Sequence, residues 1–291
     1  MPNPLSHPAV NFALTNRLPR TLCTIVFGKL SRVRHPVLAR LMIAIWRRFS
    51  DLDLSDSLRQ SFDSLHECFV RELKPGARPI QGGPGTMSSP CDAIIGAHGV
   101  IDDMTLLQAK SMPYRLDELL GSAESAATYR GATYVTLRLT AQMYHRFHSP
   151  IACRIGRVDY LSGDCWNVNP PALDRVPRLF CRNERAVIHG EVGESGERFA
   201  LVAVAAILVA SIRLKFADVL LHLRYRGINP IACNHHANRG DELGWFEHGS
   251  TIIVLGPIGW KLAGSLETGV RIRMGEVLLA APRQEIGRAH V

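Results

Sequence analysis

Two periods of hydrophobic positions divide the chain. Between residues 17 and 49 apolar side chains recur every three or four positions, which is the repeat of an amphipathic helix. Residues 17–34 predict one helix, which Gly28 weakens by about 1 kcal/mol relative to alanine. Pro36 suits the first turn of a second helix, because its backbone angle is already helical. The apolar face of this second helix comprises Leu38, Leu41, Met42, Ile45 and Phe49.

A third helix is predicted after Ser55 and Asp56, since both residue types cap helix N-termini well. The sequence Lys74-Pro75-Gly76 would end it. Its apolar stripe would comprise Leu58, Phe62, Leu65 and Phe69.

Beyond residue 85 the sequence pattern changes to short segments joined by glycine and proline. Residues 135–140 and 270–274 alternate apolar and polar side chains, as half-buried strands do. Residues 251–255 and the apolar run 199–212 are typical of buried strands, and the run is shorter than the roughly 20 residues that span a bilayer. The sequence therefore predicts an α+β fold, with a β-rich core and amphipathic N-terminal helices.

The positive charge lies at one end of the chain. The net charge is +8, and residues 1–50 hold eight Lys and Arg residues but no Asp or Glu, so residues 51–291 sum to zero. Nucleic-acid arms combine such charge with polar sequence, whereas this segment is strongly apolar. We therefore predict that residues 1–50 bind an anionic lipid surface rather than nucleic acid. An acid-free, arginine-rich N-terminus also fits a mitochondrial transit peptide.

The cysteines predict no disulfide framework. There are seven, an odd number, and no C-x-x-C pair occurs. Reduced thiols in a reducing compartment are the simpler interpretation.

Three segments carry candidate chemistry. They are Ser89–Ala93, Tyr144–Pro150 and Gly240–Thr251. Together they supply an aspartate, a histidine and a serine, the set in which a carboxylate orients an imidazole that takes the proton of a hydroxyl. The candidates are Asp92, His148 and Ser250. His145 and His148 also have the spacing of two metal ligands, but no third ligand follows at a suitable distance, and we predict no metal.

These segments resemble phosphatidylserine decarboxylase. Tyr144–Pro150 matches the family's Tyr-His-Arg-x-His-x-Pro segment, Gly249-Ser250-Thr251 matches its self-cleavage motif, and Pro90–Ala93 matches its Pro-x-Asp-Gly segment. Further matches are Gln108–Lys110, Gly163-Asp164, Val168-Asn169, Arg182–Arg185 and Gly240–Gly244. The resemblance runs from about residue 17 nearly to the C-terminus.

The chain departs from the family pattern at three places. His248 replaces the leucine before the Gly-Ser pair, Ala93 replaces a glycine, and Ala205 replaces the glycine of a Val-Gly-Ala motif. None of these changes removes a reacting group. His248 places a second imidazole beside the expected scissile bond.

The resemblance implies a self-cleaving enzyme. His148, oriented by Asp92, would activate Ser250 to attack the carbonyl of Gly249, and the chain would separate into residues 1–249 and 250–291. Ser250 would become a pyruvoyl group, a covalently held pyruvate that forms a Schiff base with phosphatidylserine and accepts the electrons released with CO2. His145 would serve as proton donor or phosphate contact, or merely as a structural neighbour of His148.

The same resemblance implies a peripheral enzyme of two parts. Residues 1–50 would bind the membrane and residues 51–291 would form the catalytic domain. The two cleavage products would stay together as a heterodimer, with further dimerisation implied by the family alone. The cytoplasmic side of a cell membrane is favoured, with the mitochondrial inner membrane as the alternative.

Three other functions remain open from the residues alone. A serine hydrolase could use Asp92, His148 and Ser250, although the G-x-S-x-G elbow is absent around Ser250. A catalytically silent lipid-binding relative would keep Gly249 and Ser250 joined. A pyruvoyl enzyme for soluble amino acids would have no use for a lipid-facing N-terminus.

Overall fold

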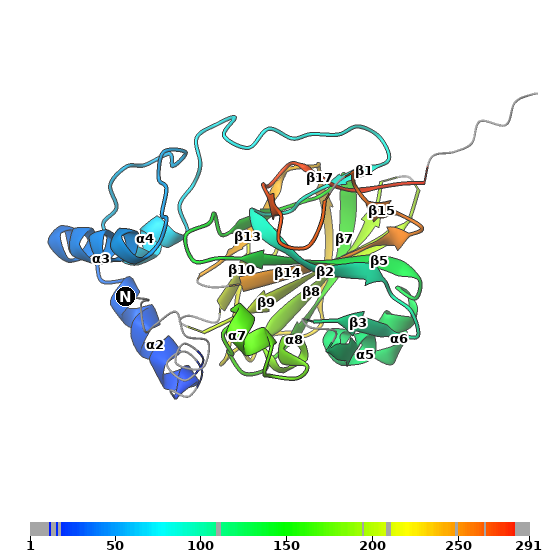
Figure 1. Cartoon of the computed structure of the whole chain (residues 1–291), viewed down its shortest axis with the longest axis horizontal. Helices are drawn as coiled ribbons and strands as arrows, with labels where there is room; N and C mark the ends of the chain where they lie inside the picture. The colour runs from blue at the N-terminus through cyan, green and yellow to red at the C-terminus, as the bar shows by residue number, and fades with distance from the viewer. Residues whose placement is uncertain are drawn as a thin grey trace, which may run out of the picture.

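Antiparallel strands form the larger part of the regular secondary structure (Figure 1). The computed structural model describes residues 12, 16, 19–108, 112–193, 195–207, 211–247, 250–264 and 266–282. The largest sheet has eight strands in the order β12 (Ile231–Ala237), β7 (Cys153–Leu161), β8 (Arg185–Val192), β9 (Arg198–Ala205), β14 (Ser250–Ile258), β5 (Ala132–Leu139), β2 (Ala93–Val100) and β16 (Arg271–Ile272).

Three smaller sheets accompany it. One has four strands in the order β11 (Val219–His222), β10 (Ser211–Leu214), β13 (Glu242–Phe246) and β6 (Arg146–His148). Another has the order β1 (Thr86–Ser88), β17 (Val277–Ala280) and β15 (Lys261–Leu262). The last pairs β3 (Thr105–Leu107) with β4 (Pro113–Arg115).

The eight-stranded sheet has an apolar core on each face, because successive side chains of a strand point to opposite sides. Ile252 and Val254 of β14 join one core, together with Ile212 and Phe246 from the four-stranded sheet. Ile253 and Leu255 of the same strand join the other core. The helices α5 (Leu116–Leu120), α6 (Ala123–Ala127), α7 (Pro170–Leu173) and α8 (Leu179–Arg182) contribute to this second core.

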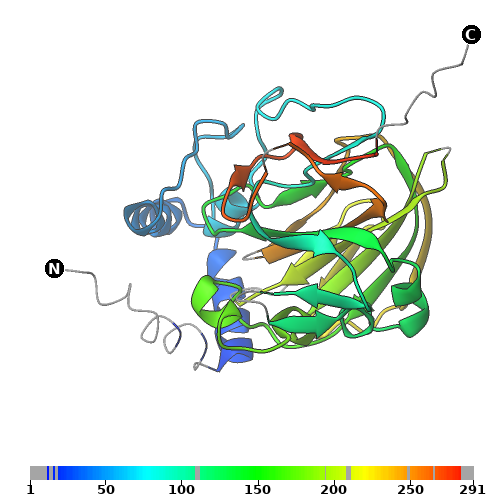
Figure 2. The same cartoon turned by 45° about the vertical axis from the view of Figure 1, so that its right-hand side comes forward.

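Three further helices lie beside the sheets in both views (Figures 1 and 2). They are α2 (Arg20–Ser31), α3 (Pro36–Phe49) and α4 (Leu65–Phe69). Their apolar contacts include a small core of Leu52, Leu54, Phe62 and Cys68, against which Ile43 and Trp46 of α3 pack. Among the described residues no helix has both the length and the apolar character needed to cross a membrane.

The α+β class with a β-rich core is confirmed. Helices α2 and α3 occupy the two N-terminal segments predicted to be helical, whereas their membrane role stays a prediction. The third predicted helix is wrong except for its last turn, α4. Its first part instead bonds to the chain beyond α4: Leu58 N donates to Glu72 O (2.9 Å) and Lys74 N to Asp56 O (2.8 Å).

Candidate active site

Ser250 opens β14 in the interior of the large sheet. Its cross-strand neighbours are Leu139 of β5 and Ala205 of β9. The residue is fully buried, and within the described residues its Oγ has no hydrogen-bond partner. His248 and Gly249, which precede it, lie outside the described residues. A buried hydroxyl without a partner costs about 1–3 kcal/mol, a cost that Ser250 shares with Thr136, Thr140 and Thr251 among the described residues.

His148 ends β6 with a neutral, oriented ring. Its Nδ1 lies 2.9 Å from the carbonyl oxygen of Gly240, so this nitrogen carries the proton, and the hydroxyl of Tyr144 donates to Nε2 (3.0 Å). Burial is the main cause that lowers the pKa of His148, and Gly240, Glu242 and Asp92 oppose it. At neutral pH His148 therefore holds a basic Nε2 that Tyr144 covers.

Asp92 is anchored by an arginine. Its carboxylate accepts two hydrogen bonds from Arg78, at 2.8 and 2.6 Å, and one from the backbone N of Met274 at 2.9 Å. The bonds found for His148 go to Gly240 and Tyr144, so Asp92 acts on that ring through its charge in this structure. The two segments are nevertheless adjacent, since His148 N donates to Pro90 O (2.8 Å). An orienting role for Asp92 stays a prediction.

His145 is more deeply buried than His148. It has no exposed surface, and its ring packs on Phe69 with centroids 4.0 Å apart. Burial lowers its pKa to about 3, so the ring is neutral. Because Nδ1 donates to the carbonyl of Met143 (2.8 Å), Nε2 is left as an acceptor, and it has no partner in the described part of the chain.

Two cavities adjoin this region and share Phe69 and Ala141 as walls. The first, of about 230 Å³, is also lined by Leu139, Asn167, Asn169 and Ala206, so it reaches the strand ends that flank Ser250. The second, of about 400 Å³, is lined by apolar residues alone: Phe27, Met42, Ile45, Trp46, Leu65, Phe69 and Ala141. An apolar groove between α2, α3 and α4 thus meets a more polar cavity beside Ser250.

Helix α2 is fastened to this region at both ends. Arg20 forms an ion pair with Asp164, with Nε 3.1 Å from Oδ1. Arg32, just beyond the helix, pairs with Glu247, three residues before Ser250. The helix is therefore coupled to the segment that carries the candidate nucleophile.

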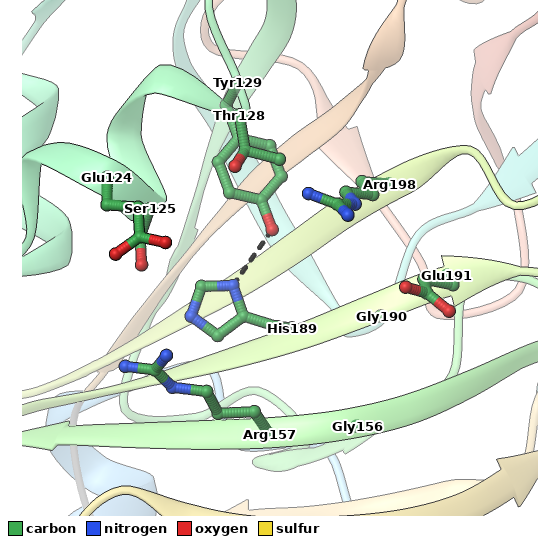
Figure 3. Close-up of a pocket in the computed structure, with 10 residues that line it drawn as sticks. All are labelled: Glu124, Ser125, Thr128, Tyr129, Gly156, Arg157, His189, Gly190, Glu191 and Arg198. Atoms are coloured by element: carbon green, nitrogen blue, oxygen red, sulfur yellow. Dashed lines mark hydrogen bonds between the residues drawn. The ribbon is translucent and has the colours of Figure 1, made fainter.

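A separate polar cavity of about 240 Å³ lies at the other end of the sheet (Figure 3). Tyr129 and His189 meet there at 3.0 Å, and the ring of His189 continues to Asp159 at 2.9 Å. Arg198 on its wall begins β9, whereas Ala205, the neighbour of Ser250, ends that strand. This cavity is therefore remote from the Ser250 region.

Comparisons with known proteins all lead to one family. The family model described as phosphatidylserine decarboxylase matches residues 65–280. A phosphatidylserine decarboxylase proenzyme of Brevibacillus brevis is 35% identical over 273 residues, covering 91% of this chain and 95% of the relative. That of Bordetella pertussis is 35% identical, covering 89% and 90%, and that of Pseudomonas entomophila is 34% identical, covering 92% and 96%.

The chain belongs to the phosphatidylserine decarboxylase family. The predicted family and its carboxy-lyase activity are thereby confirmed. The name proenzyme, which these relatives carry, denotes a precursor that is processed. In this member of the family, the candidate serine begins a buried central strand and both candidate histidines are neutral.

Sequence reasoning missed three side chains of this region. Tyr144 on His148 and Arg78 on Asp92 are the direct partners of the predicted residues. Tyr144 was visible as part of the histidine motif, whereas nothing in the sequence singled out Arg78. The third is Glu184, which the sequence gave no role and which is fully buried.

Proposed function

We propose that this chain cleaves itself between Gly249 and Ser250 and decarboxylates phosphatidylserine with the pyruvoyl group left at position 250. The observation that carries the proposal is the Oγ of Ser250, which is buried and without a partner in the described residues. Most buried hydroxyls in folded proteins are hydrogen-bonded. A nucleophile that reacts once within its own backbone has no such requirement.

The proposed cleavage starts with His148. The Tyr144 hydroxyl gives up its bond, and Nε2 accepts the proton of Ser250. The freed oxygen attacks the carbonyl carbon of Gly249, the C–N bond breaks, and an ester replaces the peptide. Loss of the α-proton of residue 250 then expels the carboxylate of Gly249. Residue 250 is left as dehydroalanine. Water then replaces its nitrogen, which departs as ammonia.

The residues around position 250 fit the group so formed. Ala205, the neighbour on β9, is small, and the adjoining cavity of about 230 Å³ is lined by Asn167 and Asn169, whose Oδ1 atoms accept hydrogen bonds from Asn169 N and Ala172 N. A pyruvoyl carbonyl condenses with the substrate amine and accepts the electron pair released with CO2. His145 supplies an unprotonated Nε2, which suits it to accept a hydrogen bond rather than to donate a proton.

The apolar groove supports a lipid as substrate. Its walls hold no charged residue, and it shares Phe69 with the cavity beside Ser250. We propose that an acyl chain lies between α2, α3 and α4 while the serine headgroup enters the polar cavity. A soluble amino acid would leave this groove without an occupant.

We further propose that α2 and α3 rest on the membrane. Leu22, Val26 and Leu30 of α2 are exposed at every fourth position. On α3 the same spacing exposes Val37, Leu41, Ile45 and Phe49. Such rows bury apolar surface in a lipid interface. The protein would then be a peripheral one, on the cytoplasmic face of a cell membrane or, alternatively, at the mitochondrial inner membrane.

The cations of this region divide into two groups. Arg20, Arg32 and Arg34 pair with Asp164, Glu247 and Glu67. Arg40, Arg47 and Arg48 are exposed, and no ion pair is found for them in the described part of the chain. The second group is free to attract anionic lipid, each residue contributing about 1 kcal/mol.

The experiment that tests the proposal is reaction with a carbonyl reagent. Hydroxylamine should add to the fragment that starts at residue 250 and abolish release of CO2 from phosphatidylserine vesicles. Ser250→Ala should stay uncut and should not react. Decarboxylation by an enzyme that hydroxylamine leaves unmodified would overturn the proposal, and hydrolysis of the lipid without CO2 would favour a serine hydrolase.

A further inference from the structure

The carboxyl group of Glu184 is buried, with the side chain of Tyr160 beside it. The residue has no exposed surface, and neither Oε1 nor Oε2 has a hydrogen bond within the described residues. A carboxyl group in such a place costs several kcal/mol if it is ionised. A side chain kept at this cost is a functional candidate.

Its position is in line with Ser250. The carbonyl of Glu184 accepts a hydrogen bond from Ala205 N (2.9 Å), which extends the ladder between β8 and β9 by one residue. Ala205 in turn lies opposite Ser250. Two strand spacings put Glu184 and Ser250 roughly 10 Å apart.

Glu184, Ala205 and Ser250 share one face of the sheet. Ala186, Ala205 and Ile252 all belong to the core under the four-stranded sheet. Side chains two positions apart point the same way, so Glu184 and Ser250 point into this core as well. Ala205, whose side chain is a methyl group, is the residue between them in the ladder.

The surroundings keep Glu184 protonated. Arg185, its neighbour in sequence, uses its guanidinium on the carbonyls of Leu119, Cys181, Asn183 and Glu118, at 2.7 to 2.9 Å. Tyr160 and Cys165 are the titratable groups that act on the carboxyl, and both are neutral near pH 7 because burial raises their pKa values. Burial likewise raises the pKa of Glu184 from 4.5 to about 8, against the opposing effect of the Tyr160 side chain.

We propose that Glu184 is the acid that protonates the substrate carbon after CO2 has left, an inference that rests on the proposed function. The O–H bond of the carboxyl breaks, and the proton joins the electron pair released with CO2 to form a C–H bond. Glu184 is left as a carboxylate and regains a proton from solvent water when the product leaves. Residue 250, which would carry the adduct, lies on the face of the sheet that Glu184 shares.

The other nearby groups are less suited to this step. His145 has no proton on Nε2. The hydroxyl of Tyr160 donates to His222 O (2.8 Å), and burial raises its pKa far above neutrality. General acids work best with a pKa near the working pH, and Glu184 is the group that meets this condition.

Glu184→Gln tests the proposal, because glutamine keeps the size of the side chain and removes its acidic proton. Glu191→Gln, on the exposed end of the same strand, is the matched control. Self-cleavage should proceed in both variants. The kcat of Glu184→Gln should fall by about 100-fold or more, the usual share of a general acid, with KM little changed.

A second readout separates an acid from a structural residue. Without its proton donor, the electron pair is protonated more often at the carbonyl carbon of residue 250. Hydrolysis then leaves an alanine at position 250 and releases the substrate as an aldehyde. Mass spectrometry of the small chain should show alanine accumulating with turnover in Glu184→Gln and not in Glu191→Gln.

Failure of the proposed function and failure of the Glu184 assignment give different results. Wild-type protein that is uncut or releases no CO2 contradicts the proposed function itself. Wild-type activity with an unchanged kcat and no alanine in Glu184→Gln overturns the assignment of Glu184 alone. A lower kcat without alanine assigns Glu184 a structural role and overturns it as well.

Discussion

Replacing Glu184 with glutamine should stabilise the fold in a pH-dependent way. Burial raises the pKa of this carboxyl from 4.5 to about 8, so between these pH values the native state holds a proton that the unfolded state has released. The wild-type stability from this group is complete below pH 4.5 and is lost as pH rises toward 8. Each pH unit in this window removes about 1.4 kcal/mol.

The size of the stability difference follows from this change of about 1.4 kcal/mol per pH unit. At pH 7 the wild type should be less stable than Glu184→Gln by about 3 kcal/mol, and above pH 8 by about 5 kcal/mol. Below pH 4.5 the two should be similar, because native and unfolded wild type are then both largely protonated. A gain in stability joined to a loss of activity is the usual pattern for a strained functional residue.

Urea denaturation between pH 5 and 8 measures the difference. Both proteins should carry Ser250→Ala, so that a single uncut chain unfolds. Glu191→Gln in the same background is the control, since its half-buried side chain lies at the other end of the same strand. A stability difference between Glu184→Gln and wild type that is equal at pH 5 and pH 8 would refute the view that Glu184 is a buried neutral acid.

The remaining predictions concern the histidines, Asp92 and the membrane. His148→Ala and Asp92→Asn should block or greatly slow self-cleavage, whereas His145→Ala should permit it and impair decarboxylation; the reverse pattern on a denaturing gel would exchange the two histidine roles. Because burial lowers the pKa of His148, the rate of self-cleavage should begin to fall at a lower pH than an ordinary histidine base would give, and a rate that halves at pH 6.5 or above in a time course would contradict a neutral buried base. Charge reversal of the arginines at 40, 47 and 48 should reduce co-sedimentation with phosphatidylserine vesicles at low salt without affecting cleavage, compared with reversal of those at 130, 224 and 226; equal binding by the two triple variants would place the lipid contact elsewhere.

Local patterns predicted the local structure well. The stripes of α2 and α3 depend on spacing alone, so the sequence sufficed for both helices. The third helix failed because Leu58 and Lys74 took part in backbone bonds between segments on either side of α4, which local propensity does not reveal. Tertiary contacts outweigh propensity in such short segments.

The candidate site likewise contains residues that the sequence predicts and residues that only the fold reveals. The resemblance of short motifs selected Asp92, His148 and Ser250 without any knowledge of the fold. Arg78 could not be predicted, because its pairing with Asp92 depends on how the chain between them returns. The relation of Glu184 to Ser250 appears only once β8, β9 and β14 are known to be neighbours in the sheet.

The central claim is that the chain converts Ser250 into its own prosthetic group. Intact mass spectrometry of purified protein tests it most directly. We expect two chains, residues 1–249 and 250–291, the smaller lacking a free N-terminal amine and having the mass expected for pyruvate in place of serine. A single chain with the full mass of the 291 residues and undiminished decarboxylase activity would contradict it.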